Sequence, residues 1–164
     1  PGLRIAVNVS SREMRDHDFM EACRSILQSH AHDQPLDIEV TESLLMDDIN
    51  HSMWLLQGLR DLGCQIAIDD FGTGYSSLNY LARLPVDIIK IDQSFVATLT
   101  HSPETMSLVT NIINLAHSLS LQLVAEGVEE EEQMKLLRLL RCDQLQGYLL
   151  GRPVPAAQFE AEYL

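Results

Sequence analysis

Short apolar runs rich in β-branched residues alternate with stretches of helical periodicity along the whole chain. Six of these runs predict strands, and they cover residues 5–9, 36–41, 65–68, 86–91, 121–125 and, with a weaker pattern, 144–149. Near-continuous apolar strands that alternate with helices are typical of a parallel sheet covered by helices. Such a sheet is either doubly wound or closed into a barrel.

Two of the predicted helices carry clear start signals. Ser102 and Pro103 are typical of an N-cap followed by the first helical position, and apolar residues then recur at helical spacing as far as residue 116. A second helix is predicted after Gly127, where the acidic run 130–132 precedes a leucine stripe and basic residues follow. The acidic run is therefore interpreted as a solvated helix start.

Counting the strand–helix units separates the two architectures. Six units are present in 164 residues, whereas a closed eight-unit barrel typically takes about 250 residues. We therefore expect an α/β fold of the TIM-like (β/α) barrel type, with six of the expected eight strands in this chain.

Composition limits the classes of partner. Twenty-four acidic against eleven basic residues give a formal net charge of -13, which argues against binding of a DNA or RNA polymer through a basic surface. The acidity suits a protein that binds metal cations, although solubility alone explains it equally well. Cys23, Cys64 and Cys142 are too few and too far apart for a disulfide framework, so we expect reduced thiols and a cytoplasmic protein. No apolar run approaches the roughly 20 residues of a membrane span, and no membrane contact is expected of this segment.

A polar residue stands near the carboxyl end of every predicted strand. These residues are Asn8, then Glu39 and Glu42, Asp69 and Asp70, Lys90 and Asp92, Glu126, and Gln146. In parallel α/β sheets this end of the strands forms the active face. Any single position is explained more simply as a helix cap or turn residue. Glu39 and Lys90, however, lie inside apolar runs, where an unpaired charge is costly, so the set indicates a site.

The adjacent carboxylates Asp69 and Asp70 repel each other and raise each other's pKa values unless a divalent cation neutralises them. Oxygen ligands without Cys or His favour magnesium, manganese or calcium. Two such ions about 4 Å apart lower the pKa of a bridging water and hold the attacking and leaving oxygens of a phosphoryl group, which indicates phosphate-ester hydrolysis. Lys90 either orients the attacking water and neutralises phosphate charge, or forms an ion pair with a carboxylate such as Asp92.

Six motifs resemble those of one family, the EAL domains, which are bacterial phosphodiesterases that cleave cyclic di-GMP to the linear dinucleotide. They are VNVS at 7–10, EVTE at 39–42, DDFGTGYSSL at 69–78, KID at 90–92, AEGVE at 125–129 and QGY at 146–148. They cover essentially the whole chain in the order and spacing of the family, and the decapeptide at 69–78 is the most specific of them.

The resemblance implies a role for each of these positions. Asn8, Glu39 and Asp69 resemble ligands of one metal ion, and Asp69, Asp70 and Glu126 resemble the group that holds a second. The implied catalytic residues are Lys90, Glu126 and Asp70, with Lys90 contacting the nucleophilic water and Gln146 lying beside it and the substrate phosphate. Glu42 resembles the glutamate that steadies the loop from Phe71 to Ser77, which includes Gly72, Thr73 and Gly74, and Glu129 supports the same site. The implied cofactor is Mg²⁺ or Mn²⁺ in a two-metal site, with Ca²⁺ as inhibitor or substitute.

The Glu-Ala-Leu motif of the family, whose glutamate is a metal ligand, does not occur in this chain. The resemblance therefore implies that residues 1–164 are a single partial EAL domain, with the first two strands and the first helix upstream. The expected activity is metal-dependent hydrolysis of cyclic di-GMP to linear pGpG. The alternatives are a non-catalytic cyclic di-GMP receptor module and an inactive partial barrel. The resemblance also implies a homodimer and a parent protein that carries GGDEF or sensory domains, membrane-anchored in some members.

Overall fold

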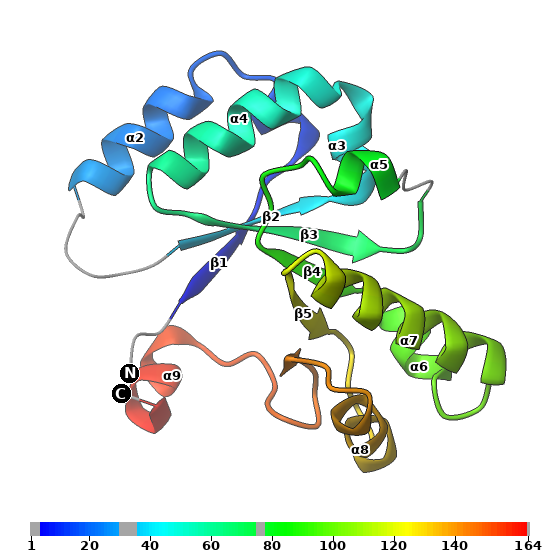
Figure 1. Ribbon diagram of the computed structural model, residues 1–164. Helices are drawn as coiled ribbons and strands as arrows, with labels where there is room; N and C mark the ends of the chain where they lie inside the picture. The colour runs from blue at the N-terminus through cyan, green and yellow to red at the C-terminus, as the bar shows by residue number, and fades with distance from the viewer. Residues whose placement is uncertain (1–3, 30–35, 75–77, 164) are drawn as a thin grey trace.

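Six parallel strands form one curved sheet in the computed structural model, which describes residues 4–29, 36–74 and 78–163 (Figure 1). The strands are β1 (Ile5–Asn8), β2 (Leu36–Thr41), β3 (Gln65–Phe71), β4 (Ile88–Ile91), β5 (Gln122–Ala125) and β6 (Gln144–Leu145). Each strand pairs in parallel with the next one along the chain. The sheet is a half-barrel of the TIM-like type, which confirms the α/β class and the six strands expected from the sequence.

Helices follow the strands and cover the convex side of the sheet, except for α9 (Ala156–Tyr163), which lies apart from the sheet near the ends of the chain (Figure 1). The others are α1 (Ser11–Met14), α2 (Phe19–Ser29), α3 (Glu42–Asp47), α4 (Ile49–Asp61), α5 (Leu78–Leu81), α6 (Gln93–Thr98), α7 (Pro103–Ser118) and α8 (Glu131–Leu139). Helix α4 packs against β3 and α2, and α7 packs against β4 and β5. No helix within the described ranges has the length and apolar character needed to cross a membrane.

Both helix starts predicted from the sequence are confirmed. Ser102 is the N-cap of α7 and accepts a hydrogen bond from the Thr105 N–H at 3.1 Å, with Pro103 at the first position. The acidic run opens α8, where the buried Gln133 accepts the N–H groups of Glu129 and Glu130 at 2.9 and 3.0 Å. These hydrogen bonds satisfy backbone donors that a helix start leaves without partners.

Five strand boundaries differ from the predicted ones. Strand β1 ends one residue early, at Asn8, and β5 begins one residue late, at Gln122. Strand β3 continues to Phe71, so Asp69 and Asp70 lie within it rather than after it. Strand β4 begins at Ile88 instead of residue 86. Strand β6 ends at Leu145, and the predicted continuation to residue 149 is wrong, because the Leu149 N–H bonds to the Val128 carbonyl in a neighbouring turn instead of extending the sheet.

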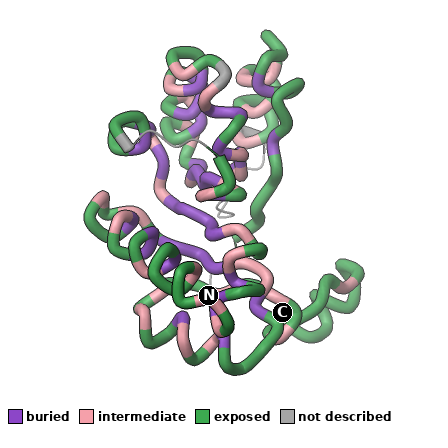
Figure 2. Tube along the Cα trace, turned by 90° about the vertical axis from the view of Figure 1, so that its right-hand side faces the viewer, coloured by how far each residue is buried: buried purple, intermediate pink, exposed green. Residues whose placement is uncertain are grey.

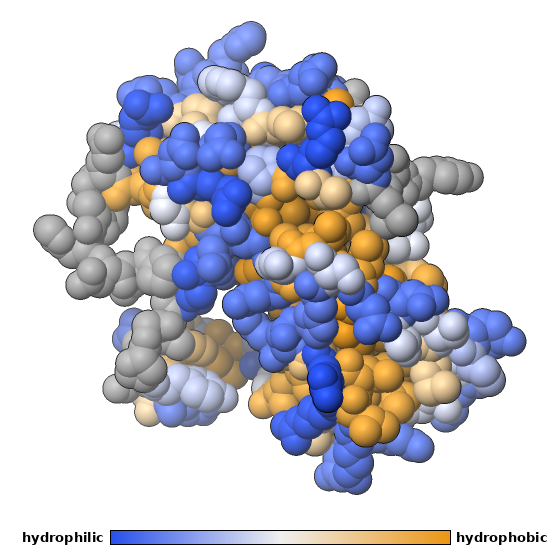
Figure 3. Space-filling view, viewed as in Figure 1, coloured by the Kyte–Doolittle hydropathy of each residue, from blue (hydrophilic) through white to orange (hydrophobic). Residues whose placement is uncertain are grey.

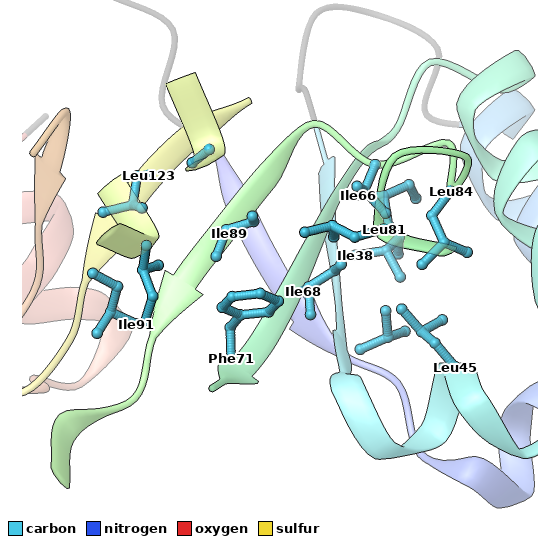
Figure 4. Close-up of a cluster of buried hydrophobic side chains, with 14 of the residues drawn as sticks. Ile38, Leu45, Ile66, Ile68, Phe71, Leu81, Leu84, Ile89, Ile91 and Leu123 are labelled. Atoms are coloured by element: carbon cyan, nitrogen blue, oxygen red, sulfur yellow. The ribbon is translucent and has the colours of Figure 1, made fainter. Parts of the chain in front are cut away.

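The two faces of the sheet carry different side chains. The convex face supplies the main core, in which Ile66, Ile89 and Leu123 are fully buried under the helices (Figures 2 and 4). The concave face lines a hollow of about 730 Å³ with polar side chains at its amino end, a small apolar group formed by Ala67, Ile88 and Val124, and charged residues at the carboxyl ends of the strands. The outer helices also expose apolar side chains: Leu139 is 78% exposed on α8, where apolar surface is visible (Figure 3). The sheet therefore separates a packed apolar core from an open polar hollow.

Candidate active site

Lys90 stands at the centre of the charged residues on the concave face. Its ammonium nitrogen lies 2.7 Å from Glu126 Oε1, 2.9 Å from Glu39 Oε2 and 3.3 Å from Asp69 Oδ1. These carboxylates come from β2, from β3 and from the residue that follows β5, while the lysine lies on β4 between them. Three of the strand-end carboxylates predicted to lie close together therefore meet around one cation.

The charge state of Lys90 follows from its surroundings. Burial alone would lower its pKa, but the hydrogen bonds and negative charges of Glu126 and Glu39 outweigh burial and raise the pKa above the ordinary value. The lysine is therefore a firmly protonated cation at neutral pH. The predicted ion pair of Lys90 with a neighbouring carboxylate is present, but its partners are Glu39, Asp69 and Glu126. Asp92, the example named from the sequence, instead caps α6 and accepts the Ser94 N–H at 3.0 Å.

Asp69, Asp70 and Glu126 form a second grouping that overlaps the first. Each offers an oxygen, and the three oxygens lie within 4.8 Å of one another. Adjacent residues of a regular strand point to opposite faces. Here the pairing of β3 with β4 shifts between Ile68 and Phe71, and Asp70 has a φ of 54°, so the local bulge turns neighbouring carboxylates toward a common point. An aspartate tolerates this left-handed conformation better than most residues.

The electrostatics of this grouping are unfavourable for carboxylates alone. Burial, followed by the negative charges of Asp69 and Asp92, raises the pKa of Asp70. Burial and the charges of Asp69 and Glu39 likewise raise the pKa of Glu126 against the opposing effect of Lys90. A convergent set of oxygen ligands whose charges repel is a set that fits a hard divalent cation. The donor chemistry on β3 and after β5 therefore suits the metal expected from the sequence.

Asn8 and Glu39 lie at the neighbouring carboxyl ends of β1 and β2, where they are register partners. Asn8 is exposed, and Glu39 is tied to Lys90. The ligand set of Asn8, Glu39 and Asp69 therefore comes from three adjacent strands, and its role as a first metal site stays a prediction.

Glu42 contacts the loop that follows β3. This glutamate is 3% exposed at the first position of α3, and its Oε2 accepts the Gly72 N–H at 3.0 Å. A Cβ atom at Gly74 would lie 2.9 Å from Glu42 Oε1, so the loop passes the carboxylate closely. The Thr73 hydroxyl donates to the Asp70 carbonyl at 2.8 Å, which links the loop to the acidic group. Residues 75–77 of the predicted loop lie outside the described residues.

Gln146 and Glu129 lie on the turns beyond β6 and β5. Gln146 is exposed and lines the hollow together with Lys90 and Glu39. Glu129 is exposed, and its backbone N–H bonds to Gln133. The supporting role of Glu129 stays a prediction.

The sequence named Asp92 only as a strand-end residue and a candidate partner of Lys90, and it did not predict that Asp92 lies near Asp70. Burial opposes ionisation of Asp92, but hydrogen bonds from Ser94, and the proximity of the Asp70 carboxyl, outweigh burial and lower the Asp92 pKa. The signal was available in the alternation of Lys90 and Asp92, since residues two apart at a strand end share a face.

Comparison with known proteins decides the family. The model of the EAL domain family matches residues 1–153. The chain belongs to the EAL domain family. This EAL chain is 41% identical over 162 residues to "Cyclic di-GMP phosphodiesterase PdeR" of Escherichia coli, with 98% of the chain and 24% of that protein covered. It is 45% identical over 158 residues to "Bifunctional diguanylate cyclase/cyclic di-GMP phosphodiesterase MucR" of Pseudomonas aeruginosa, with 96% of the chain and 23% of that protein covered.

Solved structures of EAL domains have the same fold. A structure described as "PaMucR Phosphodiesterase, c-di-GMP complex" superposes with a TM-score of 0.89 at 44% identity and covers 95% of the EAL chain and 64% of its own. The EAL domain of Mycobacterium smegmatis DcpA superposes with a TM-score of 0.86 at 40% identity, covering 98% and 71%. The EAL chain thus spans about a quarter of the length of the curated relatives it matches. EAL phosphodiesterases are metal-dependent, in agreement with the acidic group described above.

Proposed function

We propose that this EAL chain carries most of the active site of a phosphodiesterase that hydrolyses cyclic di-GMP to linear pGpG. The observation that carries the proposal is the contact of Lys90 with Glu39, Asp69 and Glu126, next to the oxygens of Asp70. The names of PdeR and MucR and the cyclic di-GMP complex of a similar structure support the choice of substrate.

The assignment of ligands follows the donor sets on the strands. Asn8, Glu39 and Asp69 would hold one divalent ion, and Asp69, Asp70 and Glu126 a second, with Mg²⁺ or Mn²⁺ favoured by oxygen-only ligation. Ca²⁺, which accepts longer and less regular coordination, would bind as an inhibitor or a substitute. When bound, such ions lower the pKa of water and stabilise charge on phosphoryl oxygens.

The protein's own groups have distinct tasks in the reaction. Hydrolysis adds water to one phosphorus atom and breaks its bond to a 3′-oxygen, which leaves with a proton. Lys90 is a cation with three N–H donors, so it orients the water and stabilises the negative charge that builds on the phosphate, and it does not act as a base. Asp70 and Glu126, whose carboxylate oxygens lie within 4.8 Å of an Asp69 oxygen and of each other, would accept the proton of the attacking water. Gln146 offers its amide to a phosphate oxygen from the rim of the hollow.

The surrounding loops and further partners complete the proposal. Glu42 holds the loop at Gly72 and Gly74 close to the acidic group, and Thr73 ties that loop to Asp70. Glu129 would support the same site from the turn before α8, where its N–H donates to Gln133. By family resemblance we also assign a homodimer, and we assign GGDEF or sensory domains to the parent protein because the matched relatives are about four times longer than this chain. The remaining barrel strands, one helix and the glutamate of the Glu-Ala-Leu motif are assigned to an upstream segment.

The decisive experiment measures cyclic di-GMP hydrolysis by chromatography with Mg²⁺ or Mn²⁺, for this chain and for a form extended upstream by about 80 to 90 residues to complete a barrel. Formation of pGpG that is abolished by EDTA and by Lys90→Met supports the proposal. Activity confined to the extended form assigns the upstream segment a part in the site. If both forms bind cyclic di-GMP tightly and leave it intact, the enzyme proposal is rejected and the chain is a non-catalytic receptor module. Failure of both forms to bind or cleave the nucleotide would leave the inactive partial barrel.

A further inference from the structure

Two turns at the carboxyl end of the sheet are joined by backbone contacts that continue past the last strand pair. The Gln146 N–H donates to the Ala125 carbonyl at 2.8 Å, and the Val128 N–H donates to the Gln146 carbonyl at 3.0 Å. The Leu149 N–H then donates to the Val128 carbonyl at 3.0 Å. Gln146 lies outside any strand, yet both of its backbone polar groups are held by the segment that contains Glu126. The backbone of Gln146 is therefore tied to the acidic group.

Gly147 lies at the closest point of this contact. A Cβ atom on this residue would stand 2.2 Å from the Val128 oxygen, 2.3 Å from its nitrogen and 2.7 Å from its carbonyl carbon. These are backbone atoms, so no side-chain rotation relieves the overlap. The Val128 side chain is itself fully buried, and the interior around it is close-packed, which leaves the turn little room to retreat. Any side chain at position 147 must push the two turns apart.

We propose that Gly147 is a positioning residue for the hydrolytic reaction. Because it carries no side chain, the turn after β6 seats directly on Val128, and this contact places the amide of Gln146 at the rim of the hollow that Lys90 and Glu39 line. Gly147 touches no reacting atom and acts only through the placement of Gln146. The inference rests on the proposed function, since it assumes that Gln146 meets the substrate phosphate.

The chain offers a matched control in the same turn. A Cβ atom at Gly151 would meet only the Tyr163 hydroxyl, at 3.9 Å, which is ordinary contact. Gly151→Ala therefore adds the same methyl group four residues away without an overlap. Both glycine N–H and carbonyl groups remain in these variants, so no backbone hydrogen-bonding group is lost in either. Gly147 also has a φ of 159°, which L side chains rarely adopt, so Gly147→Ala adds backbone strain to the overlap with Val128, and Gly151→Ala adds neither.

The first measurement is hydrogen exchange of backbone amides by NMR, which needs no turnover. In the wild-type chain, exchange of the Val128 and Leu149 amides should be as slow as exchange of the Gln146 amide, which bonds to β5. Gly147→Ala should speed exchange of the Val128 and Leu149 amides by at least about 10-fold, because the two turns open more easily. Gly151→Ala should leave these rates unchanged. Unprotected Val128 and Leu149 amides in the wild type would overturn the proposal even if Gly147→Ala failed to fold.

The second measurement is a double-mutant cycle in the form of the protein that hydrolyses cyclic di-GMP with Mn²⁺. A misplacement of about 1 Å costs on the order of 100-fold, so Gly147→Ala and Gln146→Ala should each lower kcat/KM by about this factor. If Gly147 acts through Gln146, the double variant is no worse than the poorer single variant. Losses that multiply, or a Gly147→Ala variant as active as Gly151→Ala, would overturn the proposal.

The two measurements separate this inference from the proposed function. Faster Val128 exchange in Gly147→Ala, in a protein that neither binds nor cleaves cyclic di-GMP, would refute the function while supporting the contact. Normal hydrolysis by the wild type together with unchanged exchange in Gly147→Ala would support the proposed function and refute the role of Gly147.

Discussion

Replacement of Lys90 by methionine tests whether this lysine balances the charge of the acidic group. The side chains of Glu39, Asp69 and Glu126 are only 12%, 14% and 17% exposed around a lysine that is 5% exposed. Unit charges about 4 Å apart interact by about 4 kcal/mol at an effective dielectric constant of 20. Three such attractions act against the mutual repulsion of the carboxylates and against a desolvation cost of several kcal/mol for each buried ion. Methionine keeps an unbranched side chain, one heavy atom shorter, and removes the charge.

The expected loss of unfolding free energy is about 3–5 kcal/mol, the range found when one partner of a buried ion pair is removed. The measurement is urea unfolding at pH 7.5 in EDTA, followed by circular dichroism. Lys135→Met is the matched control, because Lys135 pairs with Glu131 at 3.4 Å and both side chains are more than 70% exposed. Exposed pairs of this kind contribute less than about 1 kcal/mol.

The loss of unfolding free energy in Lys90→Met should also depend on pH and on the presence of a divalent metal ion. Burial raises the pKa of Glu126 and Lys90 opposes this rise, so without the lysine Glu126 binds a proton more readily in the folded state and the variant should regain stability as the pH falls from 8 toward 5. Mn²⁺ should stabilise the variant more than the wild type, since no internal cation competes for the carboxylates. A Lys90→Met variant that loses no more stability in EDTA than Lys135→Met would refute the charge-balance argument.

Three further predictions concern other parts of the site and the core. Asp69→Asn, which removes a charge shared by both acidic groupings, should weaken Mn²⁺ binding at least about 10-fold by calorimetry, since ligand charge sets the affinity of such sites. Glu42→Ala should speed exchange of the Gly72 amide by removing its acceptor, at a cost of about 1–3 kcal/mol, whereas Glu42→Gln keeps an acceptor oxygen and should not. Burial raises the pKa of Cys142 to about 11, so its alkylation by iodoacetamide should still accelerate between pH 9 and 11. The unfolded thiol ionises at lower pH, and stability should therefore fall as the pH rises through that window.

The order of the strands could be predicted from the sequence because its determinants are local. Each apolar run is followed by a helix, and a parallel strand after a crossover helix lies next to its predecessor in most folds. The position of polar residues at strand ends follows from the same rule, which is why Glu39, Asp69 and Glu126 were predicted to meet.

The fine geometry could not be predicted, because it depends on contacts between segments far apart in the sequence. Strict alternation would place Asp69 and Asp70 on opposite faces, and only the register shift against β4 shows how both serve one site. The early end of β6 has a similar origin. The apolar pattern continues to Leu149, but the backbone there bonds to Val128 instead of to a strand. The proximity of Gly147 to Val128 has no sequence signal beyond the glycine itself.

The contacts of Lys90 link the stability of the fold to its chemistry. An ammonium group has three N–H donors, and in this structure Nζ lies within 3.3 Å of one oxygen from each of three carboxylates. This arrangement lets the acidic group fold with an internal cation already in place. The same arrangement leaves no donor for a phosphate, so Lys90 must release at least one carboxylate before it can bind substrate. Glu39, Asp69 or Glu126, if it held a divalent cation, would free a donor of Lys90 without leaving its own charge uncompensated. On the proposed function, metal loading and the availability of Lys90 are therefore coupled through Glu39, Asp69 and Glu126.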